Sequence, residues 1–426
     1  MSSTLFTNVK LKGQDGLKDL YVVDGVFKEI GEGLAAKVKA DKVVDLEEKL
    51  VVPPYCDPHI HLDYVFTALN PAAANKSGSL FEGIQRWSET KGHLTKEEIK
   101  DRAKQAMKQE ILFGVQHIRT HVDVTDPKLT ALQAMLELRD EVKDTCDLQI
   151  IAFPQEGMYA YKGGDELVAE ACKMSADLVG AIPHFEYTRE DGVASVKKAF
   201  ELAVKYDKMV DIHCDETDDE QSRFVEVLAA EALRTGIGDK ATASHTCAMH
   251  SYNNAYCFKL FKLLKLAGVN FISCPTENIH LQGRFDAYPK RRGLTRVKEL
   301  KEAGINVCFA QDSMSDPWYP LGNGNLMNVL DAGIHIGQMM SIEEICDALD
   351  LITVNGAKTL HIQDSYGIEA GKPANFIVLN AKSEFEAICN RVSVASSVRR
   401  GEFLFKRAPE VIETADKLLS GVYMQG

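Results

Sequence analysis

Eight short apolar runs recur between residues 51 and 313, and each of them ends in polar side chains that can do chemistry. Amphipathic helical patterns lie between the runs, for example over residues 96–113 and 192–207. This alternation predicts parallel strands joined by helices, because a crossover helix must cover the sheet between two parallel strands. Eight such units predict an α/β chain of the (β/α)8 TIM-barrel type. The runs are residues 51–63, 115–124, 148–157, 178–186, 209–216, 242–250, 269–278 and 305–313.

Strand-like segments flank this barrel region at both ends of the chain. Residues 1–53 contain short alternating runs that are punctuated by Asp-Gly turns and stopped by a Pro-Pro pair. Residues 366–426 contain further strand patterns. Alternation bounded by turn residues is typical of half-buried strands. We therefore expect the two segments to pair into one small β-sandwich, beside a barrel domain over residues 54–365.

A long stretch, residues 64–97, separates the first predicted strand from the next regular helical pattern. It has the composition of a loop and a short helix folded over the barrel mouth. Three roles are open for it: a lid, a contact with a neighbouring subunit, or a plain surface insertion.

The composition narrows the range of partners. Hydrophobic residues make up 45% of the 426 residues, and 49 Lys+Arg against 62 Asp+Glu give a net charge of −13. Duplex nucleic acid attracts clustered positive charge, so we expect no nucleic-acid partner. The sequence has no apolar run of roughly 18 residues, the length that a membrane span needs, so we expect no membrane partner.

The cysteines and the N-terminal sequence indicate the compartment. The chain starts without the apolar run of a secretion signal, and its ten cysteines form no CxxC pair. Most of the cysteines lie inside apolar segments. This pattern favours reduced, buried thiols in a cytoplasmic protein.

Three histidines and an aspartate stand at the ends of predicted strands. His59 and His61 end the first strand, and alternation along an extended chain points residues i and i+2 to the same face. His213 ends the fifth strand and Asp312 the eighth. Active sites of such barrels form at the carboxyl ends of the strands, so the four side chains are expected to converge. Three imidazoles and one carboxylate suit Zn²⁺ or Fe²⁺, and an ion there would lower the pKa of a bound water.

Two further residues are expected near this metal site. Glu216 follows His213 by three residues and can carry a proton from the water to a ring nitrogen of a substrate. His245 ends the sixth strand and can hydrogen-bond the attacking hydroxide or a developing oxyanion. The fourth run contains no lysine that could bridge two ions, so we expect a single divalent ion. His121 and Asp123, at the second strand, are interpreted as wall residues rather than ligands.

The motifs around these residues resemble those of the amidohydrolase superfamily. The resemblance rests on HIHLD at 59–63, HCDE at 213–216, SHT at 244–246 and the aspartate of the eighth strand. Within the superfamily, SGSLFEGIQRW, QIIAFPQEG and NIHLQGRFDAYPKRRGLTRVKEL are similar to segments of bacterial cytosine deaminases. The resemblance implies a barrel-plus-sandwich subunit that forms a homo-oligomer. It also implies hydrolytic deamination of a small cyclic amidine with one Fe²⁺ or Zn²⁺ ion.

Carried over by position, the resemblance implies a role for each site residue. The four predicted ligands would bind the ion, and Glu216 would protonate the ring nitrogen. His245 would hold the attacking hydroxide, while Asp312 would take the proton of the water and help deliver it to the leaving amine. Gln155 would hydrogen-bond the carbonyl and NH edge of the ring. The pocket would be lined by Leu80 and Trp318.

The chain departs from the cytosine deaminase pattern beside the predicted metal site. Ser313 stands where those enzymes usually carry a second aspartate, and Gln311 replaces the usual histidine. Glu277, in Cys-Pro-Thr-Glu, stands where an apolar residue is usual. A smaller residue at 313 would enlarge the pocket near the ring carbon next to the amine, and a carboxylate at 277 could meet a donor that cytosine lacks. Two interpretations stay open: neutral variation in a cytosine deaminase, or a changed substrate.

The predicted function is a metal-dependent hydrolytic deaminase with cytosine as the first expected substrate. Creatinine, 5-methylcytosine, isocytosine and isoguanine carry the same amine on a C=N carbon next to a ring amide, and they are the alternatives. A non-catalytic barrel is disfavoured because all four ligands and both acid–base residues are present. A hydrolase of cyclic amides is disfavoured by the missing lysine and by Gln155.

Overall fold

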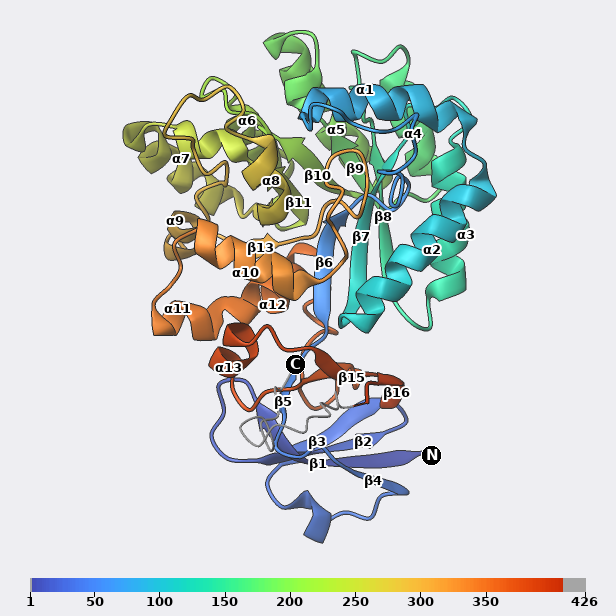
Figure 1. Cartoon of the computed structure of the whole chain (residues 1–426), viewed down its shortest axis with the longest axis vertical. Coiled ribbons are helices and arrows are strands. Elements are labelled where there is room, and N and C mark those ends of the chain that lie inside the picture. Colours follow the sequence, from blue (N-terminus) through green and yellow to red (C-terminus); the bar gives the residue numbers. More distant parts are fainter. Residues whose placement is uncertain (1, 409–426) are drawn as a thin grey trace, which may run out of the picture.

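Eight parallel strands form the barrel in the computed structural model, which describes residues 2–408 (Figure 1). Each strand pairs with its neighbours in sequence order, so the predicted (β/α)8 barrel is confirmed. The strands are β6 (Tyr55–Ile60), β7 (Val115–Asp123), β8 (Asp147–Phe153), β9 (Leu178–Ala181), β10 (Met209–Cys214), β11 (Ala241–His245), β12 (Asn270–Ser273) and β13 (Val307–Phe309).

Backbone hydrogen bonds just beyond β13 join the last strand to the first. The Asp312 amide donates to the carbonyl of His59 at 2.8 Å, and the His61 amide donates to the carbonyl of Asp312 at 3.1 Å. These two bonds form a parallel bridge between Ile60 and Asp312. The closure of the barrel therefore places three of the four predicted metal ligands side by side.

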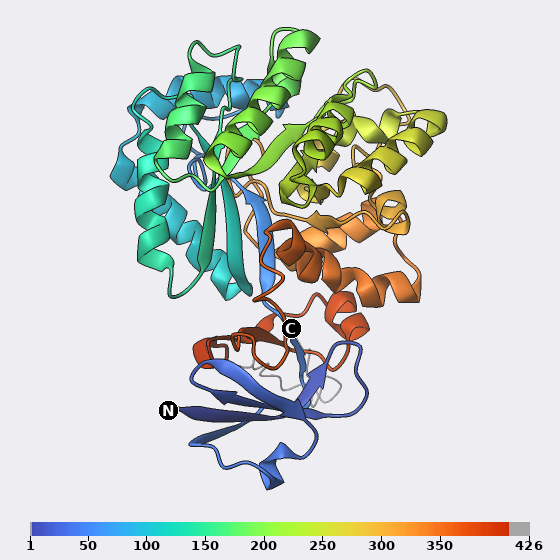
Figure 2. The ribbon, with the colours of Figure 1, turned by 180° about the vertical axis from the view of Figure 1, so that it is seen from behind.

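Helices surround the barrel, as the views from both sides show (Figures 1 and 2). The pattern at 96–113 forms α2, whose start is fixed by a capping box in which Thr95 and Glu98 satisfy each other's backbone N–H groups. The helices are α1 (Leu80–Thr90), α2 (Lys96–Leu112), α3 (Thr130–Val142), α4 (Gly164–Lys173), α5 (Arg189–Tyr206), α6 (Phe224–Thr235), α7 (Asn254–Ala267), α8 (Pro275–Leu281), α9 (Val297–Glu302), α10 (Leu326–Ile336), α11 (Ile342–Asp347), α12 (Val354–Thr359) and α13 (Glu384–Cys389).

The two ends of the chain pair into a second β-structure beside the barrel, as expected. Strand β5 lies between β1 and β14 and so joins the N- and C-terminal segments. Phe6 and Phe376 meet edge to face in its core, with ring centroids 5.0 Å apart. The strands are β1 (Ser3–Leu11), β2 (Lys18–Val23), β3 (Val26–Gly31), β4 (Lys42–Asp45), β5 (Leu50–Val52), β14 (Phe376–Leu379), β15 (Val394–Arg399) and β16 (Glu402–Lys406). The domain boundaries at 53/54 and 365/366 stay predictions, and residues 409–426 of the predicted C-terminal segment lie outside the described residues.

The long stretch 64–97 contributes α1, which lies over the carboxyl ends of the barrel strands (Figure 1). Trp87 of α1 donates its indole N–H to Asp123 at the end of β7, at 2.9 Å. Lys91, just after α1, pairs with Asp123 at 2.8 Å and with Glu156 at 2.5 Å. These contacts fasten α1 to the barrel mouth, where a lid would lie.

Two further sequence-based expectations concern buried, reduced thiols and the length of apolar helices. All ten cysteines lie among the described residues as free thiols, and eight of them are buried. Within residues 2–408, every helix is too short or too polar to cross a membrane.

Candidate active site

The four predicted metal ligands come together at the carboxyl end of the barrel. The Nε2 atoms of His61 and His213 lie 3.1 Å apart. Asp312 Oδ1 lies 3.4 Å from His59 Nε2 and 3.5 Å from His61 Nε2. Asp312 has a φ of 68°, a left-handed conformation that non-glycine residues rarely adopt and that is typical of constrained sites.

The protonation of these residues suits a cation. Burial lowers the pKa of both His61 and His213 well below the ordinary value, so their rings stay neutral and keep a lone pair. Burial opposes ionisation of Asp312, but its interactions with His59 and His245 outweigh burial and lower its pKa. Neutral imidazoles and an ionised carboxylate are the forms in which these groups bind metal ions.

An unpartnered buried atom supports the fit of an ion to this site. The Nε2 atom of His59 faces Asp312 and is buried without a hydrogen-bond partner, which is costly unless a further group binds there. Potential ligand atoms gather in two overlapping groups within the described part of the chain, each with atoms within 4.8 Å of one another. The groups are His59, His245, Cys274 and Asp312, and His59, His121 and His213.

His61 belongs to neither group, but its Nε2 atom lies 3.1 Å from His213 of one group and 3.5 Å from Asp312 of the other. His121, interpreted from the sequence as a wall residue, has its ring centroid 4.0 Å from that of His59. Burial lowers the pKa of His121 well below its ordinary value as well. The donor set fits one small divalent cation, with His121 beside it and Cys274 as a nearby group that sequence reasoning had not placed there.

The two predicted acid–base residues lie next to the ligands. His245 Nδ1 is 3.7 Å from Glu216 Oε1 and 3.8 Å from Asp312 Oδ2. The side-chain Nδ2 atom of Asn278 lies within hydrogen-bonding distance of the same nitrogen, at 3.2 Å. Burial, together with the negative charge of Asp312, raises the pKa of Glu216 well above its ordinary value. A carboxyl with a raised pKa holds its proton more strongly and is suited to donate it to a substrate nitrogen.

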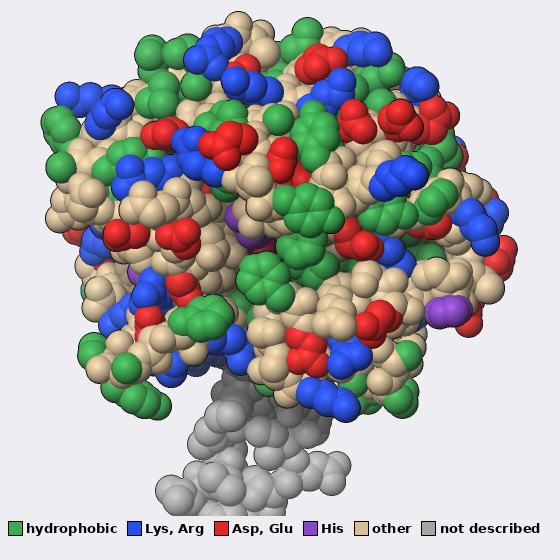
Figure 3. Space-filling view, turned by 90° about the horizontal axis from the view of Figure 1, so that it is seen from above, with side chains coloured by type: hydrophobic (Ala, Val, Ile, Leu, Met, Phe, Trp, Pro, Cys, Tyr) green, Lys and Arg blue, Asp and Glu red, His purple; other side chains and the backbone are tan. Residues whose placement is uncertain are grey.

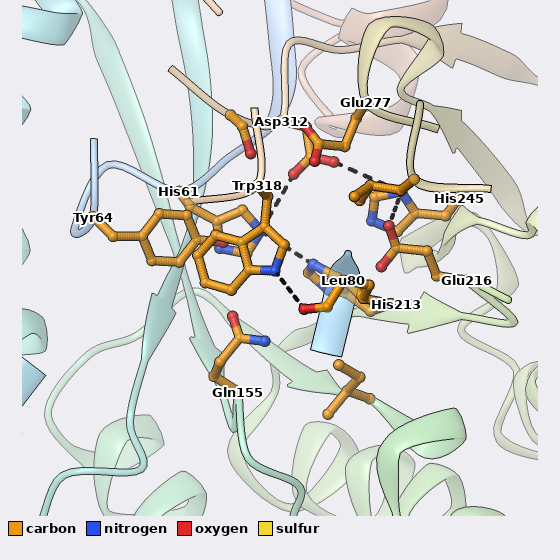
Figure 4. Close-up of a pocket in the computed structure, with 13 residues that line it drawn as sticks. His61, Tyr64, Leu80, Gln155, His213, Glu216, His245, Glu277, Asp312 and Trp318 are labelled. Carbon is orange, nitrogen blue, oxygen red and sulfur yellow. Dashed lines mark hydrogen bonds and ion pairs between the residues drawn. The ribbon is translucent and has the colours of Figure 1, made fainter. Parts of the chain in front are cut away.

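A pocket opens directly onto these residues. Gln155, from the segment after β8, lies across it from Asp312 and Glu277 (Figure 4). Its Oε1 atom is buried and without a hydrogen-bond partner, so it is free to meet a ligand. The pocket is lined by His61, Tyr64, Leu80, Gln155, Ile182, His213, Glu216, His245, Glu277, Leu281, Asp312, Ser313 and Trp318.

Two of the three departures from the cytosine deaminase pattern lie on this pocket, whereas the Gln311 amide bonds the backbone of Ser313 and Gly324. Ser313 and Glu277 are 2% and 1% exposed, and both line it. Both carboxyl oxygens of Glu277 are buried without a hydrogen-bond partner. Burial and the charge of Asp312 raise the pKa of Glu277 well above its ordinary value.

Leu80 of α1 and Trp318 form one wall of the pocket and contact each other. The indole N–H of Trp318 donates to the carbonyl of Leu80 at 3.2 Å (Figure 4). The ring of Tyr64 packs between Trp318, at 4.5 Å, and Trp87, at 5.1 Å between centroids. Seen from above, hydrophobic side chains cover the middle of this face of the molecule (Figure 3). Aromatic and aliphatic groups therefore form this wall of the pocket.

Every predicted site residue except His59 lines the pocket, and His59 lies behind it at 0% exposure. Sequence reasoning missed Tyr64, Ile182 and Leu281 as lining residues. Tyr64 directly follows the HIHLD motif, so its nearness to a strand end was a usable signal. Ile182 directly follows β9, so the same signal marked it, whereas nothing local marks Leu281.

The barrel, its metal-binding donor set and the sequence together define the class. The model of the Amidohydrolase family matches residues 42–144 and 92–404. The chain belongs to this family of metal-dependent enzymes and is a hydrolase that acts on C–N bonds of small molecules.

Individual enzymes of known activity are similar to this chain over nearly its whole length. It is 52% identical to the 5-methylcytosine deaminase of Klebsiella pneumoniae, whose crystal structure contains 5-fluorocytosine. The match covers 96% of this chain and 99% of that one, with a TM-score of 0.93. The N-isopropylammelide isopropyl amidohydrolase of Pseudomonas sp. (strain ADP) is 28% identical over 94% of this chain and 97% of its own length. The pterin deaminase of Rhizobium rhizogenes is 26% identical over 93% and 89%.

Proposed function

We propose that the chain is a metal-dependent hydrolytic deaminase of cytosine-type rings, and that 5-methylcytosine is the substrate that fits it best. The observation that supports this most is the pocket itself, in which Glu216, His245 and Asp312 lie across from Gln155. The 52% identical structure is of a 5-methylcytosine deaminase. This refines the sequence-based expectation, which put cytosine first.

One divalent ion, Zn²⁺ or Fe²⁺, would be held by His59, His61, His213 and Asp312. Such an ion supplies a water whose pKa is lowered toward neutrality and polarises the reacting centre. The neutral imidazoles and the ionised carboxylate of this set provide the donors.

The acid–base residues then move protons between water and substrate. Asp312 accepts a proton from the attacking water, and His245, 3.8 Å from it, orients the nucleophile. The oxygen adds to the ring carbon that bears the amine, and Glu216 gives its proton to the adjacent ring nitrogen. Asp312 passes its proton to the amine, the C–N bond breaks, and ammonia leaves. The remaining proton of the added hydroxyl goes to the Glu216 carboxylate, which forms the ring carbonyl and restores the acid.

The pocket walls bind and orient the ring. The Gln155 amide can donate to the ring carbonyl and accept from the ring N–H, since its Oε1 atom has no other partner. The side chains of Tyr64, Leu80 and Trp318 cover the ring and exclude water. Exclusion of water strengthens the electrostatic interactions of the reacting groups.

The departures at 313 and 277 are proposed to set the substrate range. Ser313 leaves more room than an aspartate would, and a methyl group on the ring carbon next to the amine needs that room. Glu277 presents a buried carboxyl without a hydrogen-bond partner to the same pocket, with His280 Nε2 3.8 Å away, and it is expected to meet a donor on the substrate.

The test is ammonia release by protein loaded with Zn²⁺ or with Fe²⁺, on 5-methylcytosine, cytosine, isocytosine, isoguanine and creatinine. We expect 5-methylcytosine to have the highest kcat/KM. A clear lead for cytosine would show that Ser313 does not set the preference, and a lead for creatinine would overturn the choice of ring. Absence of ammonia from all five compounds would overturn the proposed function.

A further inference from the structure

One predicted metal ligand differs from the others in how its second ring nitrogen is held. His59 Nδ1 lies 3.0 Å from the hydroxyl of Ser244. By contrast, the Nδ1 atoms of His61 and His213 are buried without a hydrogen-bond partner. Among these three imidazoles, His59 is therefore the one whose orientation and proton position are set by a protein side chain.

The hydroxyl of Ser244 has a fixed role in this contact. It lies 2.7 Å from Asp211 Oδ1 and donates its single proton there. Its remaining lone pairs can only accept, so the proton in the contact with His59 belongs to the imidazole. His59 is thereby assigned the tautomer with hydrogen on Nδ1 and a lone pair on Nε2.

The second oxygen of the Asp211 carboxyl group accepts a hydrogen bond from a buried arginine. Arg119 Nη1 lies 3.2 Å from Asp211 Oδ2, and both side chains are fully buried. Arg119 is itself fixed, since Nε donates to Gln149 at 2.9 Å and Nη2 donates to the carbonyl of Thr359 at 2.8 Å. A buried ion pair held by further hydrogen bonds on both sides keeps one geometry.

We infer that the chain Arg119–Asp211–Ser244 fixes His59 in the tautomer whose Nε2 lone pair is reserved for the metal ion. That nitrogen lies 3.4 Å from Asp312 Oδ1 and makes no hydrogen bond. The three residues are positioning residues, because none of them lies on the substrate pocket. This inference rests on the metal site of the proposed function, but not on its substrate.

A metal-binding histidine whose other N–H is held by a partner binds its ion more tightly, and loss of the partner typically costs 10–100-fold in affinity. A role confined to barrel stability predicts something different. In that case removal of the Ser244 hydroxyl would lower the free energy of unfolding and leave the tautomer and the affinity unchanged.

The first measurement uses the metal-free wild-type protein. Side-chain ¹⁵N shifts of the histidines report which ring nitrogen carries hydrogen, and the His59 signals are assigned by their loss in His59→Gln. We expect Nδ1 of His59 to be protonated and Nε2 to be bare. The opposite tautomer would overturn the inference without the need for any other variant.

The second measurement compares Zn²⁺ affinity, by competition with a chelator, across three variants. Ser244→Ala is expected to bind Zn²⁺ 10–100-fold more weakly, and Ser244→Thr, which keeps a hydroxyl, to recover most of the affinity. Ser273→Ala is the matched control, because Ser273 is equally buried at the end of β12 but its hydroxyl has no partner. Equal affinity of Ser244→Ala and Ser273→Ala would overturn the inference.

These readouts separate the inference from the proposed function. Neither of them involves turnover, so protein that shows the tautomer and the affinity loss but releases no ammonia would refute the function alone. Circular dichroism of each variant establishes that the barrel is folded before its affinity is compared.

Discussion

Gly83 of α1 packs against the indole of Trp318 so closely that a Cβ at position 83 would lie 2.4 Å from Trp318 Nε1. The same indole nitrogen donates to the carbonyl of Leu80, one turn earlier in α1. The wall of the pocket thus depends on the absence of a side chain at position 83. The fit couples α1, which comes from the long stretch after the first barrel strand, to the segment after the last one.

Substitution of Gly83 by alanine is therefore expected to displace Trp318 or α1 while the barrel still folds. A misplaced pocket wall can cost about 10–100-fold in kcat/KM. Gly92→Ala is the matched control, since a Cβ there meets nothing within 4 Å. Steady-state kinetics on 5-methylcytosine would compare the two variants, and equal kcat/KM values would contradict the role of this contact.

Glu216→Gln removes the proposed proton donor but keeps the shape of the side chain. We expect turnover to fall by about 10²–10⁴-fold, the range for loss of a general acid or base. The variant should keep its ion, which elemental analysis measures, because Glu216 is not in the proposed ligand set. Wild-type turnover in this variant would remove Glu216 from the mechanism.

The proposed ligand set can be distinguished from the neighbouring histidine by metal content. His61→Ala should lose the ion, because Nε2 of His61 lies within 3.5 Å of both His213 and Asp312. His121→Ala should retain it, although His121 lies among the potential ligands. Elemental analysis of both variants after identical loading decides the point, and a full metal complement in His61→Ala would refute the proposed set.

Ser313→Asp tests whether the size of residue 313 sets the substrate. The larger side chain should fill the space proposed for the methyl group, and one methyl group in a tight pocket is worth about 10–200-fold in selectivity. We expect kcat/KM for 5-methylcytosine to fall by about that factor, while kcat/KM for cytosine is retained. A parallel loss for both rings would indicate general damage to the site rather than a change in selectivity.

Asp147 of β8 contacts His117 of β7 at 2.8 Å, and it joins the barrel to the second β-structure through Arg399 of β15, at 2.7 Å. Partial burial would raise the pKa of Asp147, but its interactions with His117 and Arg399 outweigh burial and lower the pKa to about 2. Because the folded-state pKa lies below the unfolded value near 3.9, the stabilisation is complete above pH 4 and is lost as the pH falls through about 2.

Asp147→Asn should therefore lower the free energy of unfolding by about 1 kcal/mol at pH 7, since its carboxylate is 53% exposed and screened by solvent. The difference from wild type should shrink as the pH falls from 4 toward 2. Urea unfolding of both proteins at pH 7 and near pH 3 measures it. Asp140→Asn, an exposed aspartate on α3, controls for the loss of charge alone.

Much of the fold follows from local sequence patterns. The apolar runs predict the strands because buried parallel strands must be apolar, and the convergence of His59, His213 and Asp312 follows from the common direction of strand ends. The closure of the barrel through the backbone of Asp312 fits this scheme, since the residue directly follows the last predicted strand.

Contacts between distant segments could not be predicted in this way. The SHT motif drew attention to His245, whereas the hydroxyl of Ser244 meets an imidazole 185 residues away. In the same way, the pocket wall at Leu281 and the aromatic contact of Tyr64 with Trp318 depend on how loops from different βα units meet. Periodicity and strand ends carry no information about such pairs.

The central claim, hydrolytic removal of an amine from a cytosine-type ring, is tested most directly with labelled water. Metal-loaded protein and 5-methylcytosine are incubated in H₂¹⁸O, and the product is analysed by mass spectrometry while ammonia is measured in the same sample. The account predicts thymine with one ¹⁸O atom and one equivalent of ammonia. Unchanged 5-methylcytosine, or a product that has kept its nitrogen, would contradict it.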